Sequence, residues 1–196
     1  AIQQMEERYE LLSAVGVRHI TSYNKLGKDT RHQLLSKLYS DGEIEKLPDT
    51  MPYIVIIVDE LADLMMTSGK ETEQAIARLA QKARAVGIHV VLATQRPSTD
   101  VITGLIKSNL PSRIAFQTRT GIDSRTILDR QGAEKLLDKG DMLYLAASAG
   151  DDLRRVQGPF VSDDEVTTVV DYLKETAAPQ YTHSLIQVGA GEMKES

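Results

Sequence analysis

Two adjacent carboxylates, Asp59 and Glu60, follow the most continuous apolar stretch of the sequence. Six apolar residues run without a break from Tyr53 to Val58 immediately before them. Like charges this close repel, and burying either one is costly unless a positive charge meets it. One carboxylate can hold a hydrated Mg²⁺, which is commonly bound through a single carboxylate and phosphate oxygens. The other can orient and deprotonate a water that attacks a phosphoryl group.

A purely structural explanation of the same pair is equally open. Asp59 can cap a helix over the residues ELADLM, with Glu60 in the exposed first turn of that helix. Caps of this type are common, so the pattern alone does not decide. A second polar strand end, Thr94-Gln95, favours the chemical interpretation, because ligands of open α/β sheets gather at the carboxyl ends of the strands.

The elements that position these residues follow from the spacing of apolar side chains. Residues 53–58 and 88–94 predict two strands, and the unbroken apolar run of the first is typical of a parallel strand covered on both faces. Between them, residues 70–87 predict a helix that Gly87 ends. Another amphipathic helix is predicted over residues 3–15.

The rest of the chain continues the alternation of helices and strands. Residues 17–50 are mostly polar and predict a connecting region, with one helical turn over 34–39 and a turn over 40–43. After residue 95 we expect a short helix over 98–111, a strand over 112–118 and a helix over 123–129 that Asp123 opens. A strand over 141–146, an edge strand over 154–161 and a helix with a capping box over 162–175 are expected to follow. The alternation predicts a three-layer α/β domain.

The composition excludes several classes of protein. The 196 residues are 41% hydrophobic and 26% charged, as in ordinary globular domains, and contain no cysteine for disulfides or thiolate metal sites. The net charge of −5 argues against a uniformly basic nucleic-acid binder, but residues 95–125 carry five basic side chains against two acidic ones. The first residues lack the pattern of a secretory signal and begin without Met, so we expect part of a longer protein.

Several long stretches closely resemble the motor domain of the FtsK/SpoIIIE family of DNA translocases. They are MEERYELLSAVGVRHITSYN, IVIIVDELADLMM, IARLAQKARAVGIHVVLATQRPSTDVITGLIKSNLPSRIAF, IDSRTILD and GAEKLLDKGDMLYL, and the resemblance covers roughly residues 5–23 and 46–182. Matches of this length are more specific than any single motif. The resemblance implies a RecA-like P-loop NTPase core with a mostly parallel sheet flanked by helices, assembled as a homo-hexameric ring around double-stranded DNA.

The resemblance also implies roles for particular residues. Asp59 is then the Walker B aspartate that supports Mg²⁺ with bound ATP, and Glu60 is the catalytic base for water. Gln95 resembles the polar sensor of the γ-phosphate. Arg84 resembles the arginine finger that reaches a neighbouring subunit's nucleotide, where a guanidinium stabilises charge on the transferring phosphoryl group.

Alternatives to the arginine finger and to the DNA contacts stay open. Arg84 read alone is an ordinary solvated arginine on a helix, and Arg78 and Arg113 are other candidates for the finger. The resemblance assigns DNA phosphate contacts to basic residues after ATQ and before DSRTIL, unless these are scattered surface charges. The residues are Arg96, Lys107 and Arg125, with Arg119 standing in for a lysine that family members often carry where this chain has Gly121.

The phosphate-binding pattern G-x-x-x-x-G-K-[ST] does not occur in the sequence, since the Gly-Lys pairs at 27–28 and 69–70 are followed by acids. We therefore interpret residues 1–180 as the C-terminal part of a motor domain, with a variable insertion over 24–50. Residues 181–196 are interpreted as a linker toward a winged-helix module outside this chain. We expect little or no ATP turnover from the chain by itself.

The function implied is part of an ATP-driven translocase of double-stranded DNA for chromosome segregation at cell division. The motor domain would lie on the cytoplasmic side of the bacterial inner membrane, reaching the membrane only through segments outside this chain. Two other functions remain open. One is an FtsK-like ring ATPase of a protein secretion system, and the other is a non-catalytic α/β module.

Overall fold

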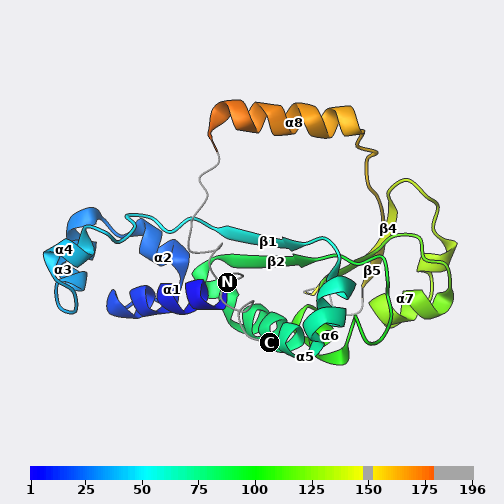
Figure 1. The fold of residues 1–196 in the computed structure, drawn as a ribbon, viewed down its shortest axis with the longest axis horizontal. Coiled ribbons are helices and arrows are strands. Elements are labelled where there is room, and N and C mark those ends of the chain that lie inside the picture. Colours follow the sequence, from blue (N-terminus) through cyan, green and yellow to red (C-terminus); the bar gives the residue numbers. More distant parts are fainter. Residues whose placement is uncertain (148–151, 179–196) are drawn as a thin grey trace, which may run out of the picture. The chain divides into compact units, whose positions relative to one another are not determined.

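A computed structural model of the chain describes residues 1–147 and 152–178, and Figure 1 shows their elements in sequence colours. The chain divides into two units, Ala1–Gln157 and Gly158–Ser196. We describe each unit by itself. The predicted linker over 181–196 lies outside the described residues.

Four helices open the first unit. Helix α1 (Ile2–Ala14) matches the predicted amphipathic helix, and Gly16 follows it with a φ of +73°. The next three are α2 (Ile20–Lys25), α3 (Lys28–Leu35) and α4 (Asp41–Ile44).

The expectation of one helical turn over 34–39 and a turn over 40–43 was therefore wrong, because residues 17–50 form three helices. These helices place Ile20, Tyr23, Leu35 and Ile44 in the largest cluster of buried apolar side chains. Distant contacts hold them there, including a hydrogen bond from the Tyr23 hydroxyl to the carbonyl of Pro48 at 3.0 Å. The predicted turn at 40–43 begins α4, which a capping box stabilises.

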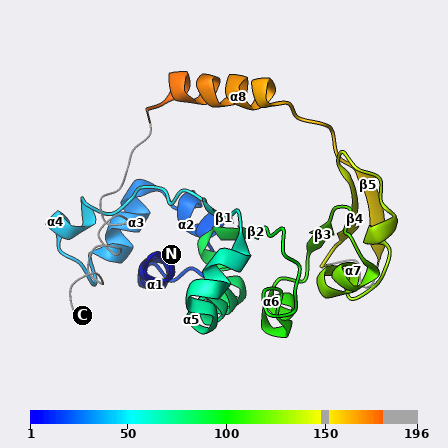
Figure 2. The ribbon, with the colours of Figure 1, turned by 45° about the vertical axis from the view of Figure 1, so that its right-hand side comes forward.

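A parallel β-α-β unit follows. Strand β1 (Ile54–Val58) pairs in parallel with β2 (Ile88–Leu92), and the register runs from Ile54↔Ile88 to Val58↔Leu92. The crossover is helix α5 (Leu61–Lys82), continued by the short 3₁₀ helix η1 (Ala83–Val86). Helices α1 and α5 lie along one face of the strand pair (Figures 1 and 2), where Ile54, Ile56 and Val90 pack into the core.

The other face of this strand pair differs from the expectation. We predicted strands covered on both faces, but Val55 is 58% exposed and Ile57 is 71% exposed. These side chains alternate with the buried ones, because successive residues of a strand point to opposite faces. Within the described residues of the first unit, the helices cover one face only.

Gly87 joins η1 to β2 in a conformation that other residues rarely adopt. Its φ is +74°, in the left-handed region, and a Cβ at this position would lie 2.5 Å from a side-chain carbon of Ile20. The predicted end of the helix at Gly87 is therefore confirmed. The missing side chain also lets α2 pack against the start of the strand.

The second half of the first unit is built around an antiparallel sheet of three strands. After the short helix α6 (Gly104–Asn109), the sheet has the order β3–β4–β5. Strand β3 (Arg113–Ala115) pairs with β4 (Asp141–Leu145), and β4 pairs with the edge strand β5 (Leu153–Gln157). The segment between β3 and β4 contains helix α7 (Gly121–Leu128) and the 3₁₀ helix η2 (Ala133–Lys135).

Two expectations for this half need correction. The sheet was predicted to be mostly parallel, whereas β1–β2 is the one parallel pair among the described strands and both pairs of the second sheet are antiparallel. Helix α7 was predicted to open at Asp123, but Thr120 caps it and Asp123 is the third helical residue of a capping box. A capping box needs both residues, and the sequence prediction used only the acidic one.

The described part of the second unit contains helix α8 (Asp163–Thr176), whose predicted capping box between Ser162 and Glu165 is confirmed. Its apolar side chains, Val166 and Val169 among them, are exposed. No helix among residues 1–147 and 152–178 is long and apolar enough to cross a membrane.

An ion pair joins the start of β4 to β5 in the antiparallel sheet. Asp141 is 3% exposed, and its carboxylate accepts from the Arg155 guanidinium at 2.9 and 2.6 Å and from the Leu137 N–H at 2.7 Å. These bonds, the Arg155 pair foremost, lower the pKa of Asp141 from 3.8 to about 2.

We expect Asp141→Asn to lower the free energy of unfolding near neutral pH. Because the pKa of Asp141 is depressed on folding, its contribution is present above pH 3.8 and is lost as the pH falls toward about 2. The difference between wild type and variant, measured by urea denaturation, should therefore shrink over that range. Asp138→Asn removes an exposed carboxylate nearby and serves as the control. A difference independent of pH would contradict the assignment.

Candidate functional site

The backbone fixes Asp59 and Glu60 at the carboxyl end of the parallel strand pair, and we call this end, with residues 59–60 and 94–95, the site edge. The Ala93 N–H donates to the carbonyl of Val58, and the Leu61 N–H donates to the carbonyl of Ala93, both at 2.8 Å. These bonds hold the chain on both sides of the two carboxylates against the end of β2. The predicted meeting of the two polar strand ends, 59–60 and 94–95, is therefore present in the structure.

The Glu60 carboxylate bridges three segments. Its Oε1 accepts from the Thr94 hydroxyl and from the Ala62 N–H at 3.1 Å, and its Oε2 accepts from the Gln95 N–H at 3.0 Å. The Thr94 hydroxyl foremost, and then the Gln95 N–H, hold the pKa of Glu60 below its ordinary value. Glu60 is therefore an ionised acceptor at neutral pH.

This geometry also identifies the residue that caps α5. The residue that caps α5 is Glu60, through its bond to Ala62, so the alternative with Asp59 as the cap was wrong. The cap does not exclude chemistry, because the same carboxylate reaches across to the end of β2. The cap is therefore shown for Glu60, and its chemical role stays a prediction.

Asp59 has a different environment from its neighbour. Its side chain is exposed and makes no hydrogen bond or ion pair with the described residues. The described residues hold no group of three or more histidine, cysteine or acidic side chains that would form a metal site by itself. One free carboxylate at this edge fits Mg²⁺, which is usually bound by one or two carboxylates together with substrate phosphates and water.

The structure adds Thr94 to the candidate site and limits the contribution of Gln95. The side chain of Gln95 is exposed, and only its backbone N–H contacts Glu60. Sequence reasoning noted Thr94 as a polar strand end without giving it a role. The sequence does not show the register of β1 against β2, and the pairing of Val58 with Leu92 is what places Thr94 beside Glu60.

Arg84 lies at the opposite end of the strands from the carboxylates. It is exposed in η1, just before β2 begins, whereas Glu60 follows the end of β1. A strand of this length spans roughly 13–17 Å, so the two residues are not brought together within one chain. The other candidates for the finger are engaged, because Arg78 pairs with Glu6 and Arg113 pairs with Asp129.

The four basic residues predicted to contact DNA have unequal environments. Arg96 is exposed directly after the site edge, Arg119 is exposed in the loop before α7, and Arg125 is exposed on α7. Lys107 differs, because its ammonium lies 2.6 Å from the Asp129 carboxylate and its side chain is only 22% exposed. The structure therefore leaves three of the four guanidinium or ammonium groups at the surface.

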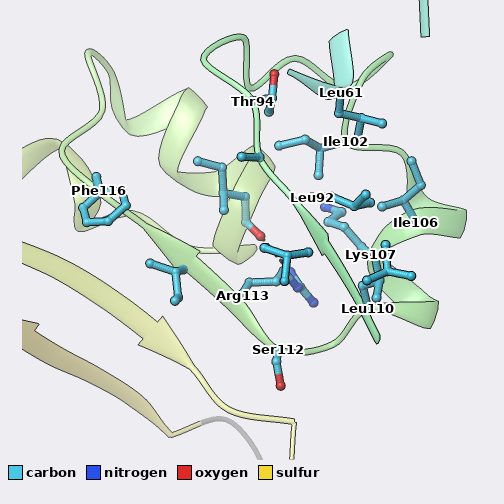
Figure 3. Close-up of a pocket in the computed structure, with 15 residues that line it drawn as sticks. Leu61, Leu92, Thr94, Ile102, Ile106, Lys107, Leu110, Ser112, Arg113 and Phe116 are labelled. Carbon is cyan, nitrogen blue, oxygen red and sulfur yellow. Dashed lines mark hydrogen bonds between the residues drawn. The ribbon is translucent and has the colours of Figure 1, made fainter. Parts of the chain in front are cut away.

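A cavity of about 460 Å³ adjoins the site between β2, α6 and β3. Figure 3 shows its lining, which is mainly apolar and includes Leu92, Ile106 and Phe116 together with Thr94. In the described part of the chain β2 pairs only with β1 and β3 only with β4, so each has one unpaired edge. The lining carries no carboxylate, so the predicted phosphoryl chemistry stays with the strand ends.

Two cations of the cavity wall share one carboxylate. Lys107 and Arg113 each donate to Asp129 at 2.6 Å, and these bonds, that of Lys107 foremost, lower the pKa of Asp129. Asp129 ends α7 in a left-handed conformation with a φ of +61°. The ion pairs thus tie α6 and β3 to the end of α7.

Solved structures of a conjugation coupling protein and of a secretion ATPase share this fold. The structure of the pCW3 conjugation coupling protein TcpA with ATPγS matches with a TM-score of 0.63 and 28% identity, over 90% of this chain and 46% of that one. The cytoplasmic domain of the Thermomonospora curvata type VII secretion ATPase EccC matches with a TM-score of 0.66 and 23% identity, over 91% of this chain and 19% of that one. The predicted class, a RecA-like P-loop NTPase core of α/β type with flanking helices, is confirmed.

Proteins more similar in sequence to this chain are named DNA translocase FtsK. DNA translocase FtsK 2 of Ralstonia nicotianae (strain ATCC BAA-1114 / GMI1000) is 54% identical over 195 residues, and DNA translocase FtsK of Pasteurella multocida (strain Pm70) is 52% identical over 202 residues. These matches cover 98% and 100% of this chain but only 25% and 22% of the relatives. The model of the FtsK/SpoIIIE family matches residues 1–99, half of the sequence, and the chain belongs to this family.

Proposed function

We propose that the chain is part of an ATP-driven motor that moves double-stranded DNA, acting in chromosome segregation at cell division. The main support is the site edge, where the ionised Glu60 lies beside the free carboxylate of Asp59. The name DNA translocase, shared by relatives about half identical to this chain, supports DNA as the cargo. The type VII secretion ATPase at 23% identity supports the fold alone, so protein secretion is the weaker alternative.

Asp59 and Glu60 would divide the chemistry between them. Asp59 would bind Mg²⁺ together with ATP, and the bound ion supplies positive charge against the phosphate oxygens. Glu60 would orient the attacking water and accept its proton. The hydrogen bonds that lower its pKa make Glu60 a weaker base, so orientation of the water is the larger part of its role.

Arg84 would act on a neighbouring subunit. Because it lies at the amino end of the strands, a position at its own site edge is out of reach. A homo-hexameric ring would place Arg84 of one subunit against the nucleotide of the next, and hydrolysis would then depend on assembly. The absence of an ion pair on Arg84 within the described residues supports this choice over Arg78 and Arg113.

The remaining parts of the proposal concern organisation. Residues 1–180 would belong to the motor domain and residues 181–196 to a connection, with the motor on the cytoplasmic side of the bacterial inner membrane. The sequence contains no phosphate-binding glycine loop. We therefore expect the 196-residue chain alone to behave as a non-catalytic α/β module, and measurable ATP turnover by it would contradict this expectation.

Glu60→Gln in the full-length protein should reduce DNA-stimulated ATP hydrolysis by roughly 10²–10⁴-fold, because an amide cannot accept the proton and no longer offers two acceptor oxygens to hold the water in place. Binding of ATP should remain, since Asp59 is untouched. Hydrolysis is measured by phosphate release, and binding by equilibrium titration with a fluorescent ATP analogue.

Asp63→Asn is the matched control, because it removes a carboxylate from the first turn of the same helix without touching Thr94 or Gln95. An equal loss in both variants would mean that the helix terminus, and not the Glu60 site, is responsible. Wild-type turnover in Glu60→Gln would reject the proposed function.

Mixing two inactive variants tests whether Arg84 acts between subunits. Arg84→Ala should lower hydrolysis by roughly 10³–10⁵-fold, as expected for an arginine finger. A mixture of Arg84→Ala with Glu60→Gln subunits should recover activity that neither variant has, because some interfaces combine an intact Glu60 with an intact Arg84. Arg78→Ala, which breaks only the pair with Glu6, should retain activity. No recovery in the mixture would exclude action in trans.

The salt dependence of DNA binding tests the basic residues. Replacing Arg96, Arg119 or Arg125 with Ala in the full-length protein should weaken DNA binding equally for all DNA sequences. The slope of the logarithm of the association constant against the logarithm of the salt concentration should decrease in magnitude by about 1 for each phosphate that the variant no longer neutralises. Lys107→Ala should leave the slope unchanged, because the ammonium is paired with Asp129. A sequence-dependent loss would point to base contacts instead.

A further inference from the structure

The hydroxyl of Thr94 lies between two groups at the site edge. It donates to Oε1 of Glu60 and accepts from the Arg96 N–H, with 3.1 Å between nitrogen and oxygen. The direction of the first bond is fixed, because an ionised carboxylate only accepts. Thr94 therefore connects the Glu60 carboxylate to the backbone of Arg96.

The two oxygens of Glu60 are unequally occupied. Oε1 accepts from the Thr94 hydroxyl and from the Ala62 N–H, whereas Oε2 accepts only from the Gln95 N–H. A carboxylate offers about two acceptor positions on each oxygen, so within the described residues Oε1 is filled and Oε2 keeps one position. That position is where Glu60 can accept a hydrogen bond from water.

The side chain of Gln95 does not take part in this arrangement. It is exposed and has no hydrogen bond with the described residues, although the residue contributes its backbone N–H to Oε2. That N–H belongs to the main chain and is present whatever side chain the residue carries. The hydroxyl of Thr94 is therefore the one side-chain donor, within the described residues, that fixes the rotation of the Glu60 carboxylate.

We propose that Thr94 is a positioning residue for ATP hydrolysis, which fills Oε1 of Glu60 and thereby aims the open acceptor position on Oε2 at the attacking water. The inference rests on the proposed function, since it takes Glu60 to be the residue that orients this water. Thr94 itself does not touch the reacting atoms. Without its hydroxyl, both carboxylate oxygens would have an open position, and water would be held in the productive geometry less often.

Thr94→Val tests the hydroxyl in the full-length protein, because valine keeps the branched shape and removes the donor. We expect kcat for ATP to fall by about tenfold or more, with KM unchanged. The fall should stay smaller than the roughly 10²–10⁴-fold effect of losing a general base, because Glu60 itself is still present. Thr94→Ser keeps the hydroxyl and should restore most of the rate. Thr67→Val is the control, since its hydroxyl bonds the Asp63 carbonyl within α5.

Hydrogen exchange of backbone amides gives a readout that is independent of ATP turnover. In the 196-residue chain, Thr94→Val should speed exchange at Arg96, which loses its acceptor, and at Gln95, whose acceptor Glu60 becomes free to rotate. Thr94→Ser and Thr67→Val should match the wild type at both amides. The rates are measured by NMR.

The two experiments separate the positioning role from the proposed function. Unchanged exchange at Gln95 in Thr94→Val, or a normal kcat in that variant while Glu60→Gln is inactive, would overturn the positioning role alone. A fall in kcat that Thr94→Ser does not restore would also overturn it. Faster exchange at both amides, combined with normal hydrolysis by Glu60→Gln, would reject the proposed function and leave the Thr94–Glu60 contact intact.

Discussion

The Glu60 carboxylate holds together the end of β1, the end of β2 and the start of α5. Its donors are the Thr94 hydroxyl and two backbone N–H groups, of which the one from Ala62 belongs to the first turn of the helix. N–H groups at a helix N-terminus and charge-assisted hydrogen bonds both stabilise a negative charge. This explains why two adjacent carboxylates are tolerated, because the protein stabilises Glu60 while water solvates the exposed Asp59.

The same parallel crossover determines which residues cannot meet. After β1, helix α5 must return the chain to the amino end of the sheet before β2 can run in the same direction. The end of α5 and the following η1, which contains Arg84, therefore lie at the far end of the strands from Glu60. Under the proposed function, Arg84 would therefore have to come from a neighbouring subunit, because the connectivity of the sheet keeps it away from Glu60 of its own chain.

Counting charges along the sequence overstates the basic surface between residues 95 and 125. Two of its five cations, Lys107 and Arg113, are paired with Asp129, which lies just outside that window. Asp129 reaches them because α7 ends there in a left-handed turn. The local excess of positive charge thus serves partly to connect α6 and β3 to α7, and Arg96, Arg119 and Arg125 are the positions that remain exposed.

The sequence by itself determined the local elements, including β1, the end of the crossover helix at Gly87 after η1 and the capping box of α8, together with the pair Asp59–Glu60. Apolar period and capping chemistry are properties of neighbouring residues, so they can be read along the chain. Only the tertiary structure decided which carboxylate caps α5, that Thr94 rather than the Gln95 side chain holds Glu60, and that the second sheet is antiparallel. It also placed Ile20, Tyr23, Leu35 and Ile44, from the segment 17–50, in the core. These depend on strand register and on contacts between residues far apart in the chain, which local periodicity does not specify.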